Sequence, residues 1–120
     1  SEMCIRDSPS DRATLAEAVV TIGFSKSKDA IEAGLARYGR IANRVRKTRM
    51  LGSAALALAY IACGRLDAYI EEQINIWDIA AGQLMLERGG GTVELITSPS
   101  NPDKSSIVSS NGKLDFEDIL

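Results

Sequence analysis

Residues 67–82, with the sequence DAYIEEQINIWDIAAG, decide how the rest of the chain is arranged. Apolar and polar side chains alternate over residues 66–71, which predicts a half-buried strand. From Ile79 the apolar positions take up helical spacing through Leu84 and Met85 as far as Arg88. The side chains of residues 80–82 are small enough for this helix to lie close against a neighbour. The stretch therefore predicts a strand that leads through a short junction into a helix.

Asp78 stands where this helix is predicted to begin. Its carboxylate can accept hydrogen bonds from the backbone N–H groups of the first helical turn, as N-cap residues do. A carboxylate held on a rigid turn is also a good ligand for a hard cation, because magnesium takes oxygen ligands. Read from the residues alone, Asp78 is either a helix cap or a metal ligand.

Three elements of the sequence resemble the C-terminal signature of the inositol monophosphatase family. They are Trp77-Asp78-Ile79-Ala80-Ala81-Gly82, Gly52-Ser53-Ala54-Ala55-Leu56 before it, and Gly89-Gly90-Gly91 after the helix. The resemblance runs from about Val19 to Asn111. It implies an α/β fold: the C-terminal half of a layered αβαβα sandwich of the sugar-phosphatase type, with a mixed sheet flanked by helices.

The resemblance also implies roles for individual residues. In the family the acid of the W-D pair is a magnesium ligand, which assigns Mg²⁺ to Asp78. The acid seven residues earlier, Glu71, corresponds to one that hydrogen-bonds a substrate hydroxyl. Gly52, Ser53 and Ala54 correspond to a turn that lies at the substrate. The N–H groups of a first helical turn suit that role, because they bind phosphate or other oxygens.

Two of these substrate-binding assignments have alternatives. Glu72 competes with Glu71, because strand alternation puts the two side chains on opposite faces and the sequence does not say which face holds the site. At the turn, Gly52 can simply allow a tight entry to the helix and Ser53 can simply cap it. The sequence leaves both questions open.

The largest departure from the family pattern concerns the metal. The family takes its other magnesium carboxylates from an upstream Glu and from a D-P-I-D-G-T element, and neither is present in this sequence. We therefore expect a C-terminal portion of a phosphatase that holds no complete catalytic set and is inactive alone. The resemblance implies that the full-length parent uses Mg²⁺ to hydrolyse a phosphate monoester, inositol monophosphate, to inositol and phosphate.

Other functions stay open at this point. A 3'(2'),5'-bisphosphate nucleotidase, a histidinol phosphatase or another sugar phosphatase belongs to the same superfamily. A non-catalytic interaction module is an alternative of a different class, and the basic cluster over residues 37–49 would then contact a partner. The resemblance leads us to expect a small-molecule phosphate ester as the binding partner and a homodimer for the full-length protein.

Composition narrows the chemistry further. The formal net charge of −2 gives no reason to expect binding to nucleic acid or to an anionic membrane. The sequence contains no His, which excludes a Ser/His triad and any His-containing zinc site. Cys4 and Cys63 lie far apart and form no C-x-x-C pair, which fits a reducing, cytoplasmic compartment. Hydrolysis would have to use carboxylates, hydroxyls and metal.

The remaining elements are predicted from local patterns. We expect a disordered or non-native leader over residues 1–12 and one family domain over residues 13–120. Within that domain the patterns predict strands at 16–24, 47–51, 92–96 and 107–109, helices at 30–45 and 54–63, and a loop at 97–106. The helix over 30–45 should bury an apolar stripe made of Ile31, Leu35, Tyr38, Ile41, Ala42 and Val45.

Overall fold

The computed structural model describes residues 8–23, 28–97 and 103–116, apart from the side chains of Ala30 and Gln73. The described residues form the strands β1 (Val19–Gly23), β2 (Lys47–Arg49), β3 (Ala68–Asn75), β4 (Thr92–Thr97) and β5 (Lys104–Ser110). These strands make one sheet in the order β2-β1-β3-β5-β4. β1 is parallel to β2 and β3, whereas β5 is antiparallel to β3 and β4. The predicted mixed sheet is confirmed.

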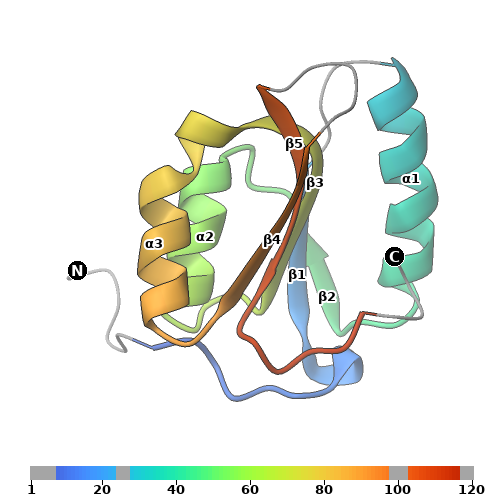
Figure 1. Ribbon diagram of the computed structural model, residues 1–120. Coiled ribbons are helices and arrows are strands. Elements are labelled where there is room, and N and C mark those ends of the chain that lie inside the picture. The colour runs from blue at the N-terminus through green and yellow to red at the C-terminus, as the bar shows by residue number, and fades with distance from the viewer. Residues whose placement is uncertain (1–7, 24–27, 98–102, 117–120) are drawn as a thin grey trace.

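Helices cover both faces of this sheet (Figure 1). α1 (Lys28–Ala42) lies on one face, and α2 (Ala54–Ala62) and α3 (Ala80–Arg88) lie together on the other. Two short 3-10 turns, η1 (Leu15–Glu17) and η2 (Ile76–Asp78), precede β1 and α3. The result is the layered α/β arrangement expected from the sequence. No helix in the described part of the chain is long and apolar enough to cross a membrane.

Side-chain alternation along β3 divides the core into two halves. Ala68 and Ile70 belong to the half under α1, together with Val20, Ile22 and Ile41. Tyr69 points the other way and joins the half under α2 and α3, whose members include Ala57, Leu58, Ile61, Leu86 and Ile107. By the same alternation Glu71 lies on the α2/α3 face and Glu72 on the α1 face. The central strand therefore sends its two consecutive carboxylates to different sides of the molecule.

The small residues at the start of α3 bring it close to α2, as predicted. Gly82 is buried, and a Cβ atom placed there would lie 2.9 Å from Cβ of Leu58 on α2. That separation is shorter than carbon atoms tolerate, so only glycine permits this approach. The close contact fixes where α3 begins, and with it the position of Asp78.

The predicted burial of α1 is wrong for its first half and for Ala42, which is exposed. Ile41 is fully buried, but Leu35 is 58% exposed and Ile31 is 38% exposed. In Figure 1 the first turns of α1 lie beyond the end of β1, so that strand does not cover them. The apolar spacing identified the helix correctly, but spacing alone does not show how far the sheet extends.

Three strands are longer than predicted: β4 by one residue, Thr97, and β3 and β5 by more. β3 continues past Glu71 to Asn75 by means of an irregularity in its pairing with β5 between Glu71 and Ile74. β5 begins at Lys104, inside the region predicted to be a loop. The turn formers over residues 97–106 concealed this start, because backbone pairing with β3 and β4 outweighs local propensity.

Two residues of the predicted leader, Ser10 and Arg12, contact the domain that follows it. Ser10 is buried, and its hydroxyl donates to Oδ1 of Asp67 just before β3. Arg12 forms an ion pair with the same oxygen at 2.8 Å. The amide of Asn111 donates to Ser10 Oγ at 3.0 Å and to the Arg12 carbonyl at 2.8 Å. Residues 1–7 lie outside the described residues, and the non-native origin of the leader stays a prediction.

Candidate functional site

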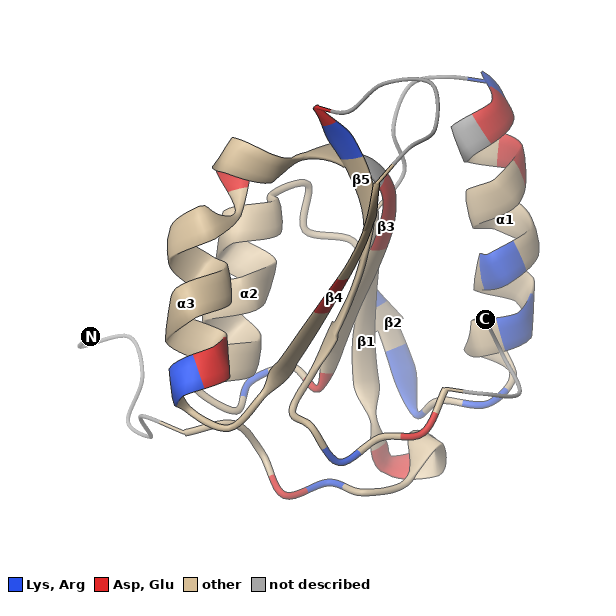
Figure 2. Ribbon diagram, in the orientation of Figure 1, with Lys and Arg blue, Asp and Glu red and all other residues tan. Residues whose placement is uncertain are grey.

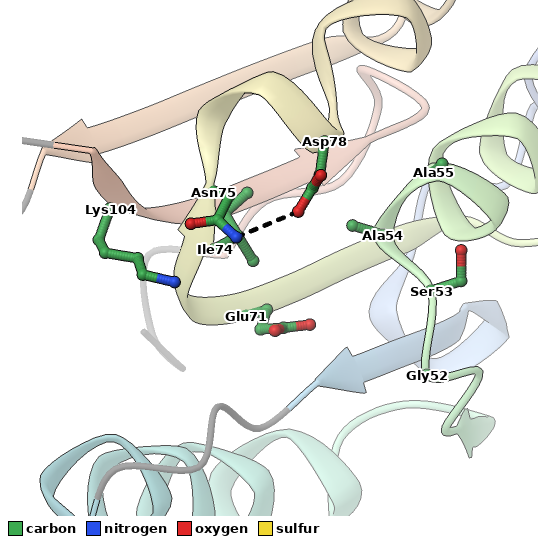
Figure 3. A pocket seen from close by; sticks show the side chains of 9 residues that line it. All are labelled: Gly52, Ser53, Ala54, Ala55, Glu71, Ile74, Asn75, Asp78 and Lys104. Atoms are coloured by element: carbon green, nitrogen blue, oxygen red, sulfur yellow. Dashed lines mark hydrogen bonds between the residues drawn. The ribbon is translucent and has the colours of Figure 1, made fainter.

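A cavity of about 410 Å³ lies on the α2/α3 face, beside the point where β3 leads into α3 (Figure 3). Residues from four segments line it: Gly52, Ser53, Ala54, Ala55, Glu71, Ile74, Asn75, Asp78 and Lys104. All five residues that the sequence singled out are among them. The structure therefore brings together, in one place, residues that were chosen from separate motifs. Their individual roles stay predictions.

The turn into α2 supplies one wall of the cavity. Gly52 has a φ angle of +70°, a left-handed conformation that glycine adopts at little cost. Ser53 is the N-cap of α2, and its side chain accepts a hydrogen bond from the Leu56 N–H at 3.2 Å. The predicted cap is confirmed. Capping uses one N–H of the first turn, and Ala54 and Ala55 still face the cavity.

Asp78 supplies the opposite wall, and it does not act as the helix cap considered above. It is the last residue of η2, whereas the N-cap of α3 is Ile79, which makes no side-chain capping bond. The Asp78 carboxylate is exposed and accepts one hydrogen bond at 3.3 Å, from the side-chain amide of Asn75. Within the described part of the chain this long hydrogen bond is the only one on the carboxylate, which leaves most of its acceptor capacity for a ligand.

Glu71 lies between these walls, at the floor of the cavity (Figure 3). Its Oε1 accepts a hydrogen bond of 2.5 Å from the hydroxyl of Tyr69, two residues earlier on the same face of β3. Burial raises the pKa of the Glu71 carboxyl, while the Tyr69 hydrogen bond acts to lower it. Burial also raises the pKa of the Tyr69 phenol, and the neighbouring carboxylate adds to that rise. The phenol therefore stays protonated and donates to Glu71.

Glu72 faces away from the cavity, which removes it as the alternative to Glu71. It forms an ion pair with Arg37 of α1 and accepts a hydrogen bond of 2.6 Å from the Ser106 hydroxyl of β5. Both partners lie on the α1 side of the sheet. Strand alternation thus gives the two glutamates separate tasks, one at the cavity and one between α1 and the sheet.

The sequence reasoning missed two polar residues of the cavity, Asn75 and Lys104. Asn75 lies on the extension of β3 and is paired with Lys104 of β5 in the sheet register. The Lys104 side chain extends toward the cavity from the side opposite α2 (Figure 3). Lys104 reaches this position because β5 begins three residues earlier than predicted. That start depends on the pairing of β5 with the part of β3 beyond its irregularity, which no local sequence pattern indicates.

The basic cluster of the sequence lies elsewhere. Figure 2 shows Lys and Arg gathered on the later turns of α1 and on β2, away from the cavity. Arg37 is committed to Glu72, whereas Arg44, Arg46, Lys47 and Arg49 are exposed. Whether these side chains bind a partner stays a prediction.

The cavity does not hold a complete magnesium site by itself. Among the described residues, no three His, Cys, Asp or Glu side chains gather closely enough to hold a metal ion. Magnesium is bound by several oxygen ligands in near-octahedral geometry. Of the acids at the cavity, Asp78 offers an exposed carboxylate, whereas Glu71 has one oxygen bound to Tyr69. The donors fit part of a metal site, so other ligands would have to come from outside the described residues.

Comparison with known proteins adds independent findings. The model of the inositol monophosphatase family matches residues 3–118. The protein named Nus factor SuhB from Xylella fastidiosa is 40% identical over 84 residues, which cover 69% of this chain and 30% of that protein. The fructose-1,6-bisphosphatase/inositol-1-monophosphatase of Thermotoga maritima is 39% identical over 79 residues, which cover 65% of this chain and 31% of that protein.

Solved structures give the same picture of the fold. The inositol monophosphatase from Anabaena superimposes with a TM-score of 0.75 and 34% sequence identity. The alignment covers 88% of this chain and 43% of that structure. The chain therefore spans roughly a third of the length of the curated relatives named above and less than half of the solved structure.

Proposed function

This chain belongs to the inositol monophosphatase family, and we propose that the longer protein containing it hydrolyses a phosphate monoester with the help of Mg²⁺. Inositol monophosphate is the proposed substrate, with inositol and phosphate as products. The name of the Thermotoga maritima relative includes an inositol-1-monophosphatase activity. We further propose that the full-length protein acts in the cytoplasm as a homodimer.

One observation carries this proposal: the assigned residues come from three separate segments of the chain and line a single cavity. Gly52, Ser53 and Ala54 come from the start of α2, Glu71 from the middle of β3, and Asp78 from η2. Nothing in a purely structural role requires these segments to share an open polar space. Their convergence supports a binding site for a phosphate ester.

The geometry divides the proposed tasks among the walls. The first turn of α2 offers N–H groups and the positive end of a helix dipole, which favour an anionic group. Glu71 accepts a hydrogen bond from a substrate hydroxyl. Asp78 acts as one of several ligands of Mg²⁺, which when bound supplies positive charge to stabilise the phosphate. Lys104 adds a cation at the rim of the cavity.

We propose that the 120-residue chain does not turn over substrate on its own, because the described residues lack a full set of metal ligands. The test uses two purified preparations, the chain itself and the full-length protein. Each is assayed for phosphate release from inositol 1-phosphate with Mg²⁺ and with a chelator. We expect Mg²⁺-dependent release only from the full-length protein. Release by the 120-residue chain would contradict its inactivity, and no release by the full-length protein would contradict the proposed function.

A substrate panel on the same full-length preparation separates inositol monophosphate from the alternatives. It includes a 3',5'-bisphosphate nucleotide, histidinol phosphate and fructose 1,6-bisphosphate. We expect the highest kcat/KM for inositol 1-phosphate. A higher value for another member of the panel would replace the substrate and keep the reaction class. Size-exclusion chromatography of the same preparation tests the homodimer.

A further inference from the structure

The side chain of Glu71 is held by a residue that no motif assigns. Tyr69 is only 2% exposed and belongs to the core under α2 and α3. Its hydroxyl reaches Oε1 of Glu71 at 2.5 Å. Because the tyrosine ring is packed on all sides, the position of its hydroxyl is set by the core. The phenol is therefore a fixed donor that selects one orientation of the carboxylate.

A glycine on the neighbouring strand leaves the space in which this carboxylate lies. Gly23 ends β1 and is paired with Glu71 in the parallel register of β1 and β3. A Cβ atom at Gly23 would overlap Oε1 and Cδ of Glu71 and would lie 2.9 Å from its Cγ. Gly23 is not among the glycines with positive φ, so its backbone does not require glycine. A side chain at this position would instead displace the Glu71 carboxylate, so glycine leaves the carboxylate the place that it occupies.

These two contacts leave the carboxylate with one oxygen for a ligand. Oε1 is bound to Tyr69, and among the described residues no hydrogen bond is made to Oε2. Glu71 lines the cavity, so the second oxygen is available on the cavity side. A carboxylate oxygen accepts hydrogen bonds and donates none, so it suits a hydroxyl donor and disfavours a phosphate oxygen at that point.

We propose that Tyr69 and Gly23 are positioning residues that hold Glu71 with one oxygen toward a substrate hydroxyl. This inference rests on the proposed function and adds to it two residues that act through Glu71. Tyr69 supplies the fixed donor. Gly23 supplies the empty space, and loss of either one turns the Glu71 carboxylate away from the hydroxyl.

The test compares two substrates on the full-length protein. Inositol 1-phosphate carries hydroxyls beside the ester, whereas 4-nitrophenyl phosphate carries none. We expect Gly23→Ala and Tyr69→Phe each to lower kcat/KM for inositol 1-phosphate by about tenfold or more, the effect of one lost hydrogen bond to a charged group. For 4-nitrophenyl phosphate each variant should stay within about twofold of wild type, because that ester does not use Glu71.

Matched variants control for unrelated damage. Gly39→Ala adds a Cβ on α1 where no atom lies within 4 Å, and Tyr60→Phe removes a hydroxyl from α2 away from the cavity. Neither control variant should change kcat/KM for inositol 1-phosphate or for 4-nitrophenyl phosphate. In a Glu71→Gln background, Tyr69→Phe should have no further effect on inositol 1-phosphate, because the residue acts through Glu71. Tyr69→Phe also keeps the test decisive if Gly23→Ala does not fold.

The outcomes separate the two claims. Equal losses on both substrates, no loss on either, or a full additional loss in the Glu71→Gln background would overturn the positioning role and leave the proposed function in place. If the wild-type protein hydrolyses neither ester, the proposed function fails, and this inference is rejected with it.

Discussion

Asp67 lies just before β3 and Glu71 in its middle, and the two carboxylates have opposite surroundings. Asp67 is fully buried, and three donors reach it: the Ser10 hydroxyl, the Arg12 guanidinium at 2.8 Å and the Val19 N–H at 2.8 Å. Among the described residues Glu71 has a single donor, Tyr69, and it faces an open cavity. The carboxylate just before β3 is therefore surrounded by hydrogen-bond donors, whereas the one in the middle of β3 keeps acceptor capacity for a ligand.

The comparison shows how a structural acid differs from one available to a ligand. A buried carboxylate is costly unless hydrogen bonds and a counter-charge compensate for lost water, and at Asp67 they do. The Glu71 carboxyl is only partly compensated, which is why burial raises its pKa. The end of the sheet near Asp67 stabilises the fold, whereas the end near Asp78 keeps polar groups free for binding.

The largest effect should follow from Asp67→Asn. The amide cannot pair with the charge of Arg12, and its NH₂ group would face existing donors. We expect the free energy of unfolding to fall by about 3 kcal/mol or more. Urea unfolding of the 120-residue chain measures it. Asp11→Asn is the control, because Asp11 is exposed next to the same segment, and it should change stability by less than about 0.5 kcal/mol. Similar values for the two variants would remove the structural role of Asp67.

The sequence predicted the two regions unequally, for a physical reason. The residues that line the cavity were assigned through a family resemblance carried by short motifs, with Gly52 and Asp78 inside those motifs and Glu71 placed by its distance from Asp78. The Asp67 network was not predicted, because its partners Ser10 and Asn111 come from distant parts of the chain and carry no local signal. The sheet was predicted from alternation, but its order and the start of β5 depend on pairing between distant segments, which local patterns do not encode.

The second largest effect concerns Asp78, at the cavity end of the sheet. Asp78→Asn in the full-length protein should lower kcat by about a hundredfold or more, because it removes a proposed magnesium ligand. The side chain is exposed with one long hydrogen bond, so the free energy of unfolding should change by less than about 0.5 kcal/mol. Assays across Mg²⁺ concentrations and urea unfolding measure the two quantities.

Glu94→Gln provides the matched control for Asp78→Asn. Glu94 is an exposed acid on β4 and does not line the cavity. It should change neither activity nor stability. A large stability loss in Asp78→Asn, with Mg²⁺ dependence unchanged, would instead give Asp78 a structural role like that of Asp67.

A smaller effect concerns the pH dependence of stability. Because the pKa of Glu71 is raised in the folded chain, the folded state holds this proton more tightly than the unfolded state. This contribution to stability is present below the unfolded pKa and is lost as pH rises through the raised folded pKa. Glu71→Gln does not ionise, so stability should fall less with rising pH than in wild type, and the variant should be the more stable near pH 7.

Urea unfolding of wild type and Glu71→Gln in steps from pH 4 to pH 8, without metal, gives the difference curve. Tyr69→Phe removes the hydrogen bond that acts to lower the Glu71 pKa, so its stability should fall more steeply with rising pH than that of wild type. Parallel curves for wild type and Glu71→Gln would show that Glu71 is as well compensated as Asp67, and the contrast between them would disappear.

The smallest effect should come from Lys104, the one cation among the residues that line the cavity. It begins β5, is half-buried, and makes no ion pair within the described part of the chain. A solvent-accessible ammonium attracts a phosphate through screened charge, so Lys104→Gln should raise KM by about two- to threefold and leave kcat unchanged. The increase should shrink as salt is added. Lys113 is exposed and does not line the cavity, so Lys113→Gln should change neither KM nor its dependence on salt. A fall in kcat would place Lys104 at the reacting phosphate and give the open end of β3 a second charged group as essential as Asp78.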